Sequence, residues 1–169
     1  DNGYGRENYR AFHDPADRLT DFPGLNHLYL RFDWGDIERE EGVFDWSYID
    51  AIMEDWSADD YRFAFRVCTY EGSAAVPSLL YATPKWVYEA GARYTRCANG
   101  ALEPDYGDPV FLDKLARFMA EFGRRFDGDP RVELVDIGTF GTWGEGHTAY
   151  GSEKTWPLDV LKAHIDLHT

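Results

Sequence analysis

The chain has 169 residues and carries 17 Lys and Arg against 31 Asp and Glu, so its formal net charge is −14 with neutral histidines. This charge excludes nucleic acid and anionic membrane surfaces as expected partners, because both are polyanions and the sequence offers no basic patch against the repulsion. Hydrophobic residues at 44% and aromatic residues at 17% exclude a disordered chain and suffice for a core. The length predicts a single domain over residues 1–169.

The sequence contains no run of about 18 apolar residues that would predict a membrane span. Residues 1–5 lack the basic and apolar regions of a secretion signal. The compartment stays open, with a secreted or periplasmic bacterial location favoured over a cytoplasmic one. Cys68 and Cys97 are too few to define a disulfide framework. We expect two reduced, partly buried thiols, with a bond between them as the alternative.

The first third of the chain predicts a loop followed by a strand, a helix and a second strand. Residues 1–25 are rich in Asp, Asn, Gly and Pro and predict the loop. Residues 27–33 and 61–67 alternate apolar and polar side chains, a period of two that predicts a strand in each. Ser47 stands at a helix N-cap position, and the helix after it places four apolar residues on one face, Ile49, Ile52, Met53 and Trp56.

The rest of the chain predicts a long loop, a helix, a strand and a final helix. The connection 70–108 is long and rich in Pro and Gly, so we expect a binding loop with short helical pieces. Asp108 caps a helix that starts at the following proline, and its apolar residues recur at spacings of three and four as far as Phe126. Residues 132–138 are more continuously apolar than alternating and predict a strand covered on both faces, and residues 157–167 predict the final helix.

This order of elements is typical of an α/β protein with parallel strands. Ligands of such sheets lie at the carboxyl ends of the strands, where residues 33–35, 68–71 and 143–147 converge. These segments supply carboxylates beside aromatic rings. The combination favours a carbohydrate site, because a ring covers the apolar face of a sugar while acids act on its hydroxyls and glycosidic oxygen. In the alternative interpretation, the glycine-rich strand ends are turns and the tryptophans belong to the core.

Glu145 is the main catalytic candidate. Trp143, Phe140 and the flanking glycines would exclude water from its carboxyl group, and a desolvated carboxyl group keeps its proton and can act as a general acid. A solvent-exposed loop glutamate is the alternative. His147 would orient the acid, contact substrate or cap a loop. Glu145, His147 and Asp136 lack the spacing of known zinc or calcium sites, so we expect no metal site and no cofactor.

Asp33 and Glu71 are candidates for a second carboxylate. Each has an alternative role as the partner of an arginine, since Arg31 or Arg66 could hold Asp33, and Arg66 could pair with Glu71. Arg66 is also a substrate candidate, because it lies near the end of a predicted strand, where a guanidinium can hold a hydroxyl group or an acidic sugar.

Several motifs resemble those of clan A glycoside hydrolases, in particular the family 42 β-galactosidases. Residues 34–38 (WGDIE) and 41–46 (EGVFDW) are similar to a W-x-x-x-E-x-x-x-G-x-(Y/F)-D-(W/F) stretch of that clan. Residues 83–86 (TPKW) look like its T-P-x-W, and residues 118–130 are similar to the helix before its acid/base strand. Residues 143–145 (WGE) fall where the clan carries its acid/base glutamate. A group of glycosidase-like barrels with a W-G-E-x-H motif is still more similar.

The resemblance implies a (β/α)8 TIM barrel, of which this chain covers roughly the first half. It implies a retaining mechanism on β-linked sugars with two carboxylates, Glu145 on the fourth strand as general acid/base and a nucleophile on the seventh. That nucleophile would lie outside this chain, because a complete barrel takes about 250 residues and at least about 200. The chain has Gly144 where the clan carries Asn, so recognition of the sugar 2-hydroxyl would differ. The expected substrate-binding residues are Trp34, Arg66, Tyr70, Trp86, Trp143 and His147.

An isolated half-barrel leaves strand edges open to water. We therefore expect the 169-residue chain to be inactive alone, and to associate with the remaining half of the barrel or with further copies of itself. The second candidate function is a non-catalytic carbohydrate-binding module or an inactive barrel, which Gly144 and the missing nucleophile favour. A small flavodoxin-like domain is a third possibility, weakened by the lack of a glycine-rich phosphate loop.

Overall fold

The computed structural model describes residues 24–57 and 61–169 of the chain. The loop predicted for residues 1–25 therefore lies almost entirely outside the described residues. No helix in the described part of the chain is both long and apolar enough to cross a bilayer. Cys68 and Cys97 are free thiols, as expected, and both are buried.

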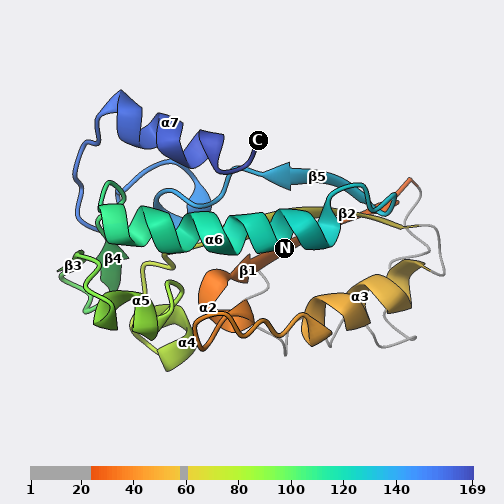
Figure 1. The fold of residues 1–169 in the computed structure, drawn as a ribbon, viewed down its shortest axis with the longest axis horizontal. Coiled ribbons are helices and arrows are strands. Elements are labelled where there is room, and N and C mark those ends of the chain that lie inside the picture. Colours follow the sequence, from red (N-terminus) through yellow and green to blue (C-terminus); the bar gives the residue numbers. More distant parts are fainter. Residues whose placement is uncertain (1–23, 58–60) are drawn as a thin grey trace.

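Three strands form a parallel sheet. β1 (His27–Asp33), β2 (Arg62–Cys68) and β5 (Val132–Asp136) lie in the order β1-β2-β5. Figure 1 shows the long helix α6 (Pro109–Phe126) running across one face of this sheet. The three predicted strands are confirmed, with the second shifted by one residue and the third ending two residues early.

The predicted helix after Ser47 is α3 (Ser47–Ser57). Its apolar face is buried as expected, with Ile49, Ile52, Met53 and Trp56 all in the core. Trp56 packs edge-on against Tyr61, with 5.0 Å between ring centroids. This contact ties the last turn of α3 to the residue before β2.

The core is built on α6. Its apolar residues recur at spacings of three and four and are buried, namely Phe111, Leu115, Phe118, Met119, Phe122 and Phe126. The Phe122 ring centroid lies 5.9 Å from those of Phe32 in β1 and Phe65 in β2. Alternate residues of the strands therefore join the helix in one aromatic core, in which each buried ring contributes roughly 1.5 to 3 kcal/mol.

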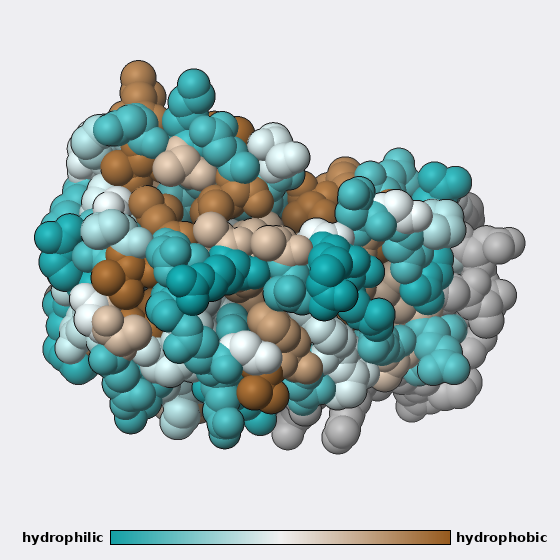
Figure 2. Space-filling view, viewed as in Figure 1, coloured by the Kyte–Doolittle hydropathy of each residue, from teal (hydrophilic) through white to brown (hydrophobic). Residues whose placement is uncertain are grey.

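The prediction that β5 is covered on both faces is wrong for the described residues. Val132 and Val135 pack against the core, whereas Leu134 is 51% exposed. The reason is that Leu134 pairs with Ala64 on the face opposite α6, whereas Val132 and Val135 pair with Phe63 and Phe65 on the face that α6 covers. A groove of about 650 Å³ runs along α6 and β5, and Figure 2 shows apolar residues gathered in this region, between α6 and α7 (Leu158–Asp166). Association through this surface stays a prediction.

The long connection after β2 contains the expected short helical pieces, α4 (Pro77–Leu80) and α5 (Lys85–Glu89). It also contains an antiparallel pair that the sequence did not predict, β3 (Tyr94–Arg96) and β4 (Leu102–Pro104). Strands this short cannot display a period of two, which is why the pattern missed them. The described residues form a parallel sheet with α6 on one face, and not a closed barrel.

The N-cap of α6 gives a test of the core helix. Asp108 accepts hydrogen bonds from the backbone N–H groups of Val110 (2.9 Å) and Phe111 (3.1 Å). Asp108→Ala should lower the free energy of unfolding by about 1 to 2 kcal/mol, measured by urea denaturation. Asp113→Ala, which removes an exposed ion pair to Arg117 in the same helix, is the control and should cost at most about 0.5 kcal/mol. Equal losses in the two variants would contradict the cap.

Candidate functional site at the carboxyl edge of the sheet

The sheet face opposite α6 is polar. Tyr29, Arg66 and Asp136 form a row across the three strands, in which Tyr29 Oη donates to Asp136 Oδ2 at 2.5 Å. Arg66 donates to the same oxygen through Nε (3.0 Å) and Nη2 (2.5 Å). Burial, with the nearby Asp136 carboxylate, raises the pKa of Tyr29. Burial alone would raise the pKa of Asp136 too, but the hydrogen bonds from Tyr29 and Arg66 outweigh it and lower that pKa.

Trp143 fixes the loop that follows β5. Its φ of 56° lies in the left-handed region, which costs a non-glycine residue roughly 1 to 2 kcal/mol. Its backbone N–H donates to the Tyr70 carbonyl (2.9 Å) and its indole N–H to the Glu71 carbonyl (3.0 Å). Its own carbonyl accepts from Cys68 Sγ (3.3 Å) and Arg66 Nη1 (3.4 Å). The loop is therefore tied to the end of β2.

The residue after Trp143 has to be glycine. Gly144 ends the short 3-10 turn η3 (Thr142–Gly144) with φ at 70°. A Cβ atom there would lie 2.3 Å from the Gly138 carbonyl oxygen and 2.8 Å from its Cα. This contact excludes any side chain at position 144, including the Asn that the resemblance would lead one to expect. The room expected beside Glu145 exists at Gly146, where a Cβ would meet no atom within 4 Å.

Glu145 is solvent-accessible. Its side chain is 46% exposed, with Oε1 4.0 Å from Arg66 Nη1 and Oε2 3.5 Å from His147 Nε2. Phe140 is buried and packs against Tyr106, with 4.5 Å between ring centroids. The predicted desolvation of Glu145 is therefore wrong for the described residues. Its carboxyl group faces a guanidinium and an imidazole instead.

Two aromatic rings stand beside Glu145, the partly buried Trp143 and the exposed Tyr150. The rings of Trp143 and Tyr150 lie 5.0 Å apart at 36°, and the His147 ring lies 6.2 Å from each of them. Tyr150 is 61% exposed. Sequence reasoning missed Tyr150, because no spacing marks a tyrosine within a glycine-rich loop. We refer to Trp143, His147 and Tyr150 as the aromatic shelf.

Four of the predicted site residues come together here, and three do not. Arg66, Trp143, Glu145 and His147 share the site. Trp34, at the start of α2 (Trp34–Ile37), is fully buried and donates its indole N–H to Glu38 Oε2 at 2.7 Å.

Trp86 and Tyr70 are also held by hydrogen bonds. Trp86 donates to the Glu38 carbonyl (3.0 Å) and packs edge-on against Trp34. Tyr70 is 2% exposed, and its hydroxyl donates to the Tyr150 carbonyl at 3.1 Å. Trp34 therefore serves the core and Tyr70 holds the aromatic shelf, so direct contact of these two with substrate does not fit the structure. Trp86 is partly buried against the same core, and its contact with substrate stays a prediction.

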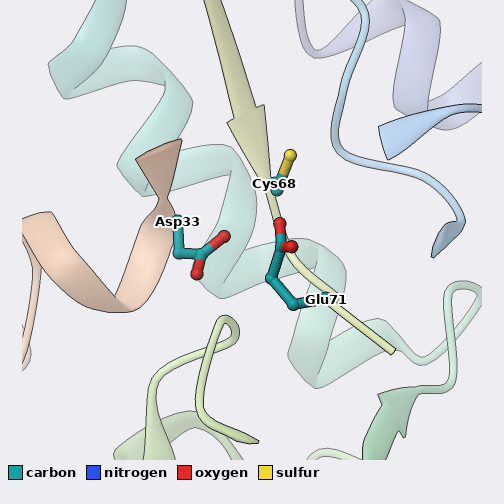
Figure 3. Close-up of side chains that lie close together, drawn as sticks. All are labelled: Asp33, Cys68 and Glu71. Atoms are coloured by element: carbon teal, nitrogen blue, oxygen red, sulfur yellow. The ribbon is translucent and has the colours of Figure 1, made fainter. Parts of the chain in front are cut away.

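Behind the loop lies a buried group that we call the strand-end cluster, made of Asp33, Cys68 and Glu71. Asp33 and Cys68 are the last residues of β1 and β2 and are paired in register. Figure 3 shows the Asp33 and Glu71 carboxylates side by side below Cys68, and one ligand-type atom from each of the three residues lies within 4.8 Å of the others. Arg31 Nη2 donates to Glu71 Oε2 at 3.1 Å. The predicted pairing of Arg66 with Asp33 or Glu71 is wrong, because Arg66 is bonded to Asp136.

Burial dominates the electrostatics of the strand-end cluster. Burial and the adjacent Glu71 carboxylate raise the pKa of Asp33 well above its usual range. Burial also raises the pKa of the Cys68 thiol and of Glu71, in the latter case against the opposing effect of Arg31. Burial therefore favours the protonated forms of Asp33, Cys68 and Glu71.

His164 of α7 fixes the strand end that precedes the loop. The Tyr106 carbonyl can only accept, so His164 Nε2 donates to it (3.0 Å) and Nδ1 accepts from Thr139 Oγ1 (3.0 Å). The Thr139 carbonyl in turn accepts from Thr69 Oγ1 (3.0 Å). His164 is 1% exposed, and its burial lowers its pKa to about 4.

No protein-family model and no curated protein matches the chain. Solved structures do match. Endo-glycoceramidase II from Rhodococcus sp. aligns with a TM-score of 0.57 and 16% identity over 98% of this chain and 41% of that one. The same enzyme has been solved as a lactosyl-enzyme intermediate. GH5_18 from Streptomyces cattleya, in complex with GlcNAc, aligns with a TM-score of 0.55 and 14% identity over 98% of this chain and 36% of that one.

A β-galactosidase from the psychrophilic Marinomonas ef1 aligns with a TM-score of 0.50 and 16% identity over 69% of this chain and 18% of that one. These relatives are clan A glycoside hydrolases with TIM-barrel folds, and the chain spans less than half the length of each. The likeness shows the fold, part of an α/β barrel. At such identities it does not single out family 42 or the W-G-E-x-H motif.

The glycines that flank Glu145 give a matched pair of variants. Both have positive φ, 70° at Gly144 and 74° at Gly146. Gly146→Ala should cost only the left-handed conformation, about 1 to 2 kcal/mol. Gly144→Ala adds the clash with Gly138 and should cost more than about 3 kcal/mol. Urea denaturation measures both, and a cost at Gly144 no larger than at Gly146 would refute the packing of this turn.

The low pKa of His164 should make the free energy of unfolding fall in acid. An unfolded histidine takes up a proton near pH 6.5, whereas folded His164 does so only near pH 4. Its contribution is therefore full above about pH 6.5 and is lost as the pH falls toward 4, about 3 kcal/mol in all. His164→Gln should remove this part of the acid dependence of the unfolding free energy. His147→Gln, at a partly exposed histidine, should leave it unchanged, and equal acid slopes in His164→Gln and the parent chain would show the assignment to be wrong.

Proposed function

We propose that the chain contributes one wall of the active site of a glycoside hydrolase that cleaves β-linked sugars with retention. Glu145 is the general acid/base in this proposal, and the nucleophile comes from outside the 169 residues. The observation that carries the proposal is the place of Glu145. Its accessible carboxyl group lies between Arg66 and His147, near the exposed ring of Tyr150 and beyond the carboxyl ends of parallel strands, where barrel enzymes hold their substrates.

The aromatic shelf suits a sugar ring. Trp143 and Tyr150 lie close together, and Tyr150 is open to solvent. Aromatic faces bind the apolar C–H face of a pyranose, and leave its hydroxyl groups to polar side chains. Tyr70 fixes the backbone of Tyr150 through its hydroxyl. The shelf is therefore preorganised, which lowers the entropy lost when a ligand binds.

The position of Glu145 between Arg66 and His147 is compatible with both halves of a retaining cycle. In the first half, protonated Glu145 gives its proton to the glycosidic oxygen as the bond to the leaving group breaks. The carboxylate left behind is stabilised by Arg66 and by His147 when protonated, which lie 4.0 Å and 3.5 Å away. In the second half, the same carboxylate removes a proton from the water that releases the sugar.

Asp136 does not supply the missing nucleophile. Its Oδ2 accepts from Tyr29 and twice from Arg66, and these bonds reduce its nucleophilicity. The lactosyl-enzyme intermediate of the Rhodococcus relative is a covalent species of the kind that a retaining mechanism forms. A carboxylate from another part of a barrel, about 5 to 5.5 Å from Glu145, would complete the pair.

A non-catalytic carbohydrate-binding site is the second candidate. Gly144 favours it, because the steric contact with Gly138 excludes the Asn that clan A enzymes carry before their acid/base residue. Such a site would use the aromatic shelf in the same way and would transfer no proton.

Replacing Glu145 by Gln separates the two functions. In the glycosidase, Glu145→Gln should reduce hydrolysis of β-linked disaccharides at least about 100-fold, because Gln cannot transfer the proton. Affinity for the disaccharide should change little, since the shape of the side chain is kept. Hydrolysis is measured on the protein as its native gene expresses it, and binding by calorimetry on the 169-residue chain.

Glu153→Gln is the matched control, since Glu153 is exposed and lies outside the proposed reaction. It should keep full activity. Sugar binding without hydrolysis in the parent protein would assign the second function. If the protein neither binds nor hydrolyses β-linked sugars, both candidate functions are refuted.

A further inference from the structure

The strand-end cluster contains a buried oxygen atom without a hydrogen-bond partner. Glu71 is 4% exposed, and Arg31 binds its Oε2. Its Oε1 has no partner among the described residues when both carboxyl groups are ionised, and a proton shared with the adjacent Asp33 is the alternative to a bound ion. Figure 3 shows the Glu71 carboxylate between the Asp33 carboxylate and the Cys68 sulfur. A carboxylate oxygen in such a position costs several kcal/mol unless it binds a proton, a water molecule or a cation.

Charge is also unbalanced at the strand-end cluster. Arg31 lies 3.1 Å from Glu71 and is one positive charge against the two carboxyl groups of Asp33 and Glu71. Arg66, two residues before Cys68 on this face, is bonded to Asp136. A buried charge needs a nearby opposite charge, because the free-energy cost of removing an unpaired ion from water exceeds the Coulomb attraction to a more distant partner. One more positive charge is needed for each negative charge that stays ionised.

The ligand types fit a divalent transition metal. Thiolate with carboxylate oxygen is a combination that zinc accepts, and thiolate disfavours magnesium and calcium. Around tetrahedral zinc, with bonds of about 2.0 to 2.3 Å, ligand atoms lie about 3.5 Å apart. The three atoms of the strand-end cluster already lie within 4.8 Å of one another. Metal binding requires the Cys68 side chain to turn from the Trp143 carbonyl toward the two carboxylates.

We propose that Asp33, Cys68 and Glu71 bind a divalent transition metal ion, with zinc as the natural choice. Three anionic ligands, a divalent cation and the Arg31 guanidinium leave the cluster without net charge, and the metal occupies the free Oε1 of Glu71. This site was invisible in the sequence, where we expected no metal, because the pairing of β1 with β2 brings its ligands together and no local spacing does.

The metal would fasten the ends of β1 and β2 behind Trp143. The Trp143 indole N–H donates to the carbonyl of Glu71, so fixing Glu71 also fixes the loop that carries Glu145. Loss of the Cys68 thiol proton removes one hydrogen bond to the Trp143 carbonyl, but Arg66 still donates to it. The ion therefore has a structural role, and the inference does not depend on the proposed glycosidase activity.

Cobalt titration tests the site directly. The 169-residue chain is freed of metal with a chelator and titrated with Co²⁺, whose bond to a thiolate gives a charge-transfer absorption band in the near ultraviolet. We expect the band to saturate at one ion per chain and to disappear when Zn²⁺ displaces the cobalt. Cys68→Ser should abolish the band. Cys97→Ser, at the other buried free cysteine, should retain it.

Glu71→Gln should weaken cobalt binding by more than the roughly 10- to 100-fold that is typical of an outer-shell partner. A second measurement needs no variant. Binding requires deprotonated ligands, so Zn²⁺ added to the parent chain should release protons into a weakly buffered solution and raise the melting temperature. The absence of a charge-transfer band in the parent chain, or the same band in Cys68→Ser, would overturn the proposal. The proposal would also be overturned if Zn²⁺ caused neither proton release nor a rise in melting temperature. That result is expected if Asp33 and Glu71 only share a proton.

Discussion

The four hydrogen bonds of Trp143 are the constraint on which the rest of the site depends. They join one residue to Arg66, Cys68, Tyr70 and Glu71, and so place the loop after β5 against the end of β2. With the backbone held in a left-handed conformation, the next residue has to pass within contact distance of Gly138, which only glycine can do. Glu145 then follows at a place where the Arg66 guanidinium reaches it. The strain at Trp143 is thus offset by bonds that also set the geometry of the candidate site.

The site contains two kinds of carboxyl group with different capabilities. Glu145 is 46% exposed and faces a guanidinium and an imidazole, so it can meet a substrate and exchange protons with it. Glu71 is 4% exposed, and no sugar reaches it without rearrangement of the strand ends. Burial alone accounts for this difference, since both residues follow parallel strands and each has an arginine nearby. The exposed carboxylate suits chemistry, and the buried one suits a structural role.

Local signals predicted most of the fold, and long-range contacts account for what was missed. The cap at Asp108 and the apolar spacing of α6 are encoded within a few residues of each other, and both were confirmed. The burial of Trp34 depends on which way the short helix α2 turns after β1, and no periodicity in four residues reveals that. The exposure of Glu145 depends on the left-handed Trp143, whose partners lie more than 70 residues earlier in the chain. The approach of Asp33, Cys68 and Glu71 likewise depends on strand register.

The central claim is that sugars bind at the aromatic shelf and not at the buried Trp34 that the sequence suggested. The most direct measurement is a titration of the ¹⁵N-labelled chain with a β-linked disaccharide, following the indole N–H resonances of its six tryptophans. The account predicts that the Trp143 resonance shifts with saturation, while that of Trp34, bonded within the core to Glu38, stays in place. A saturable shift at Trp34 with none at Trp143 would contradict it.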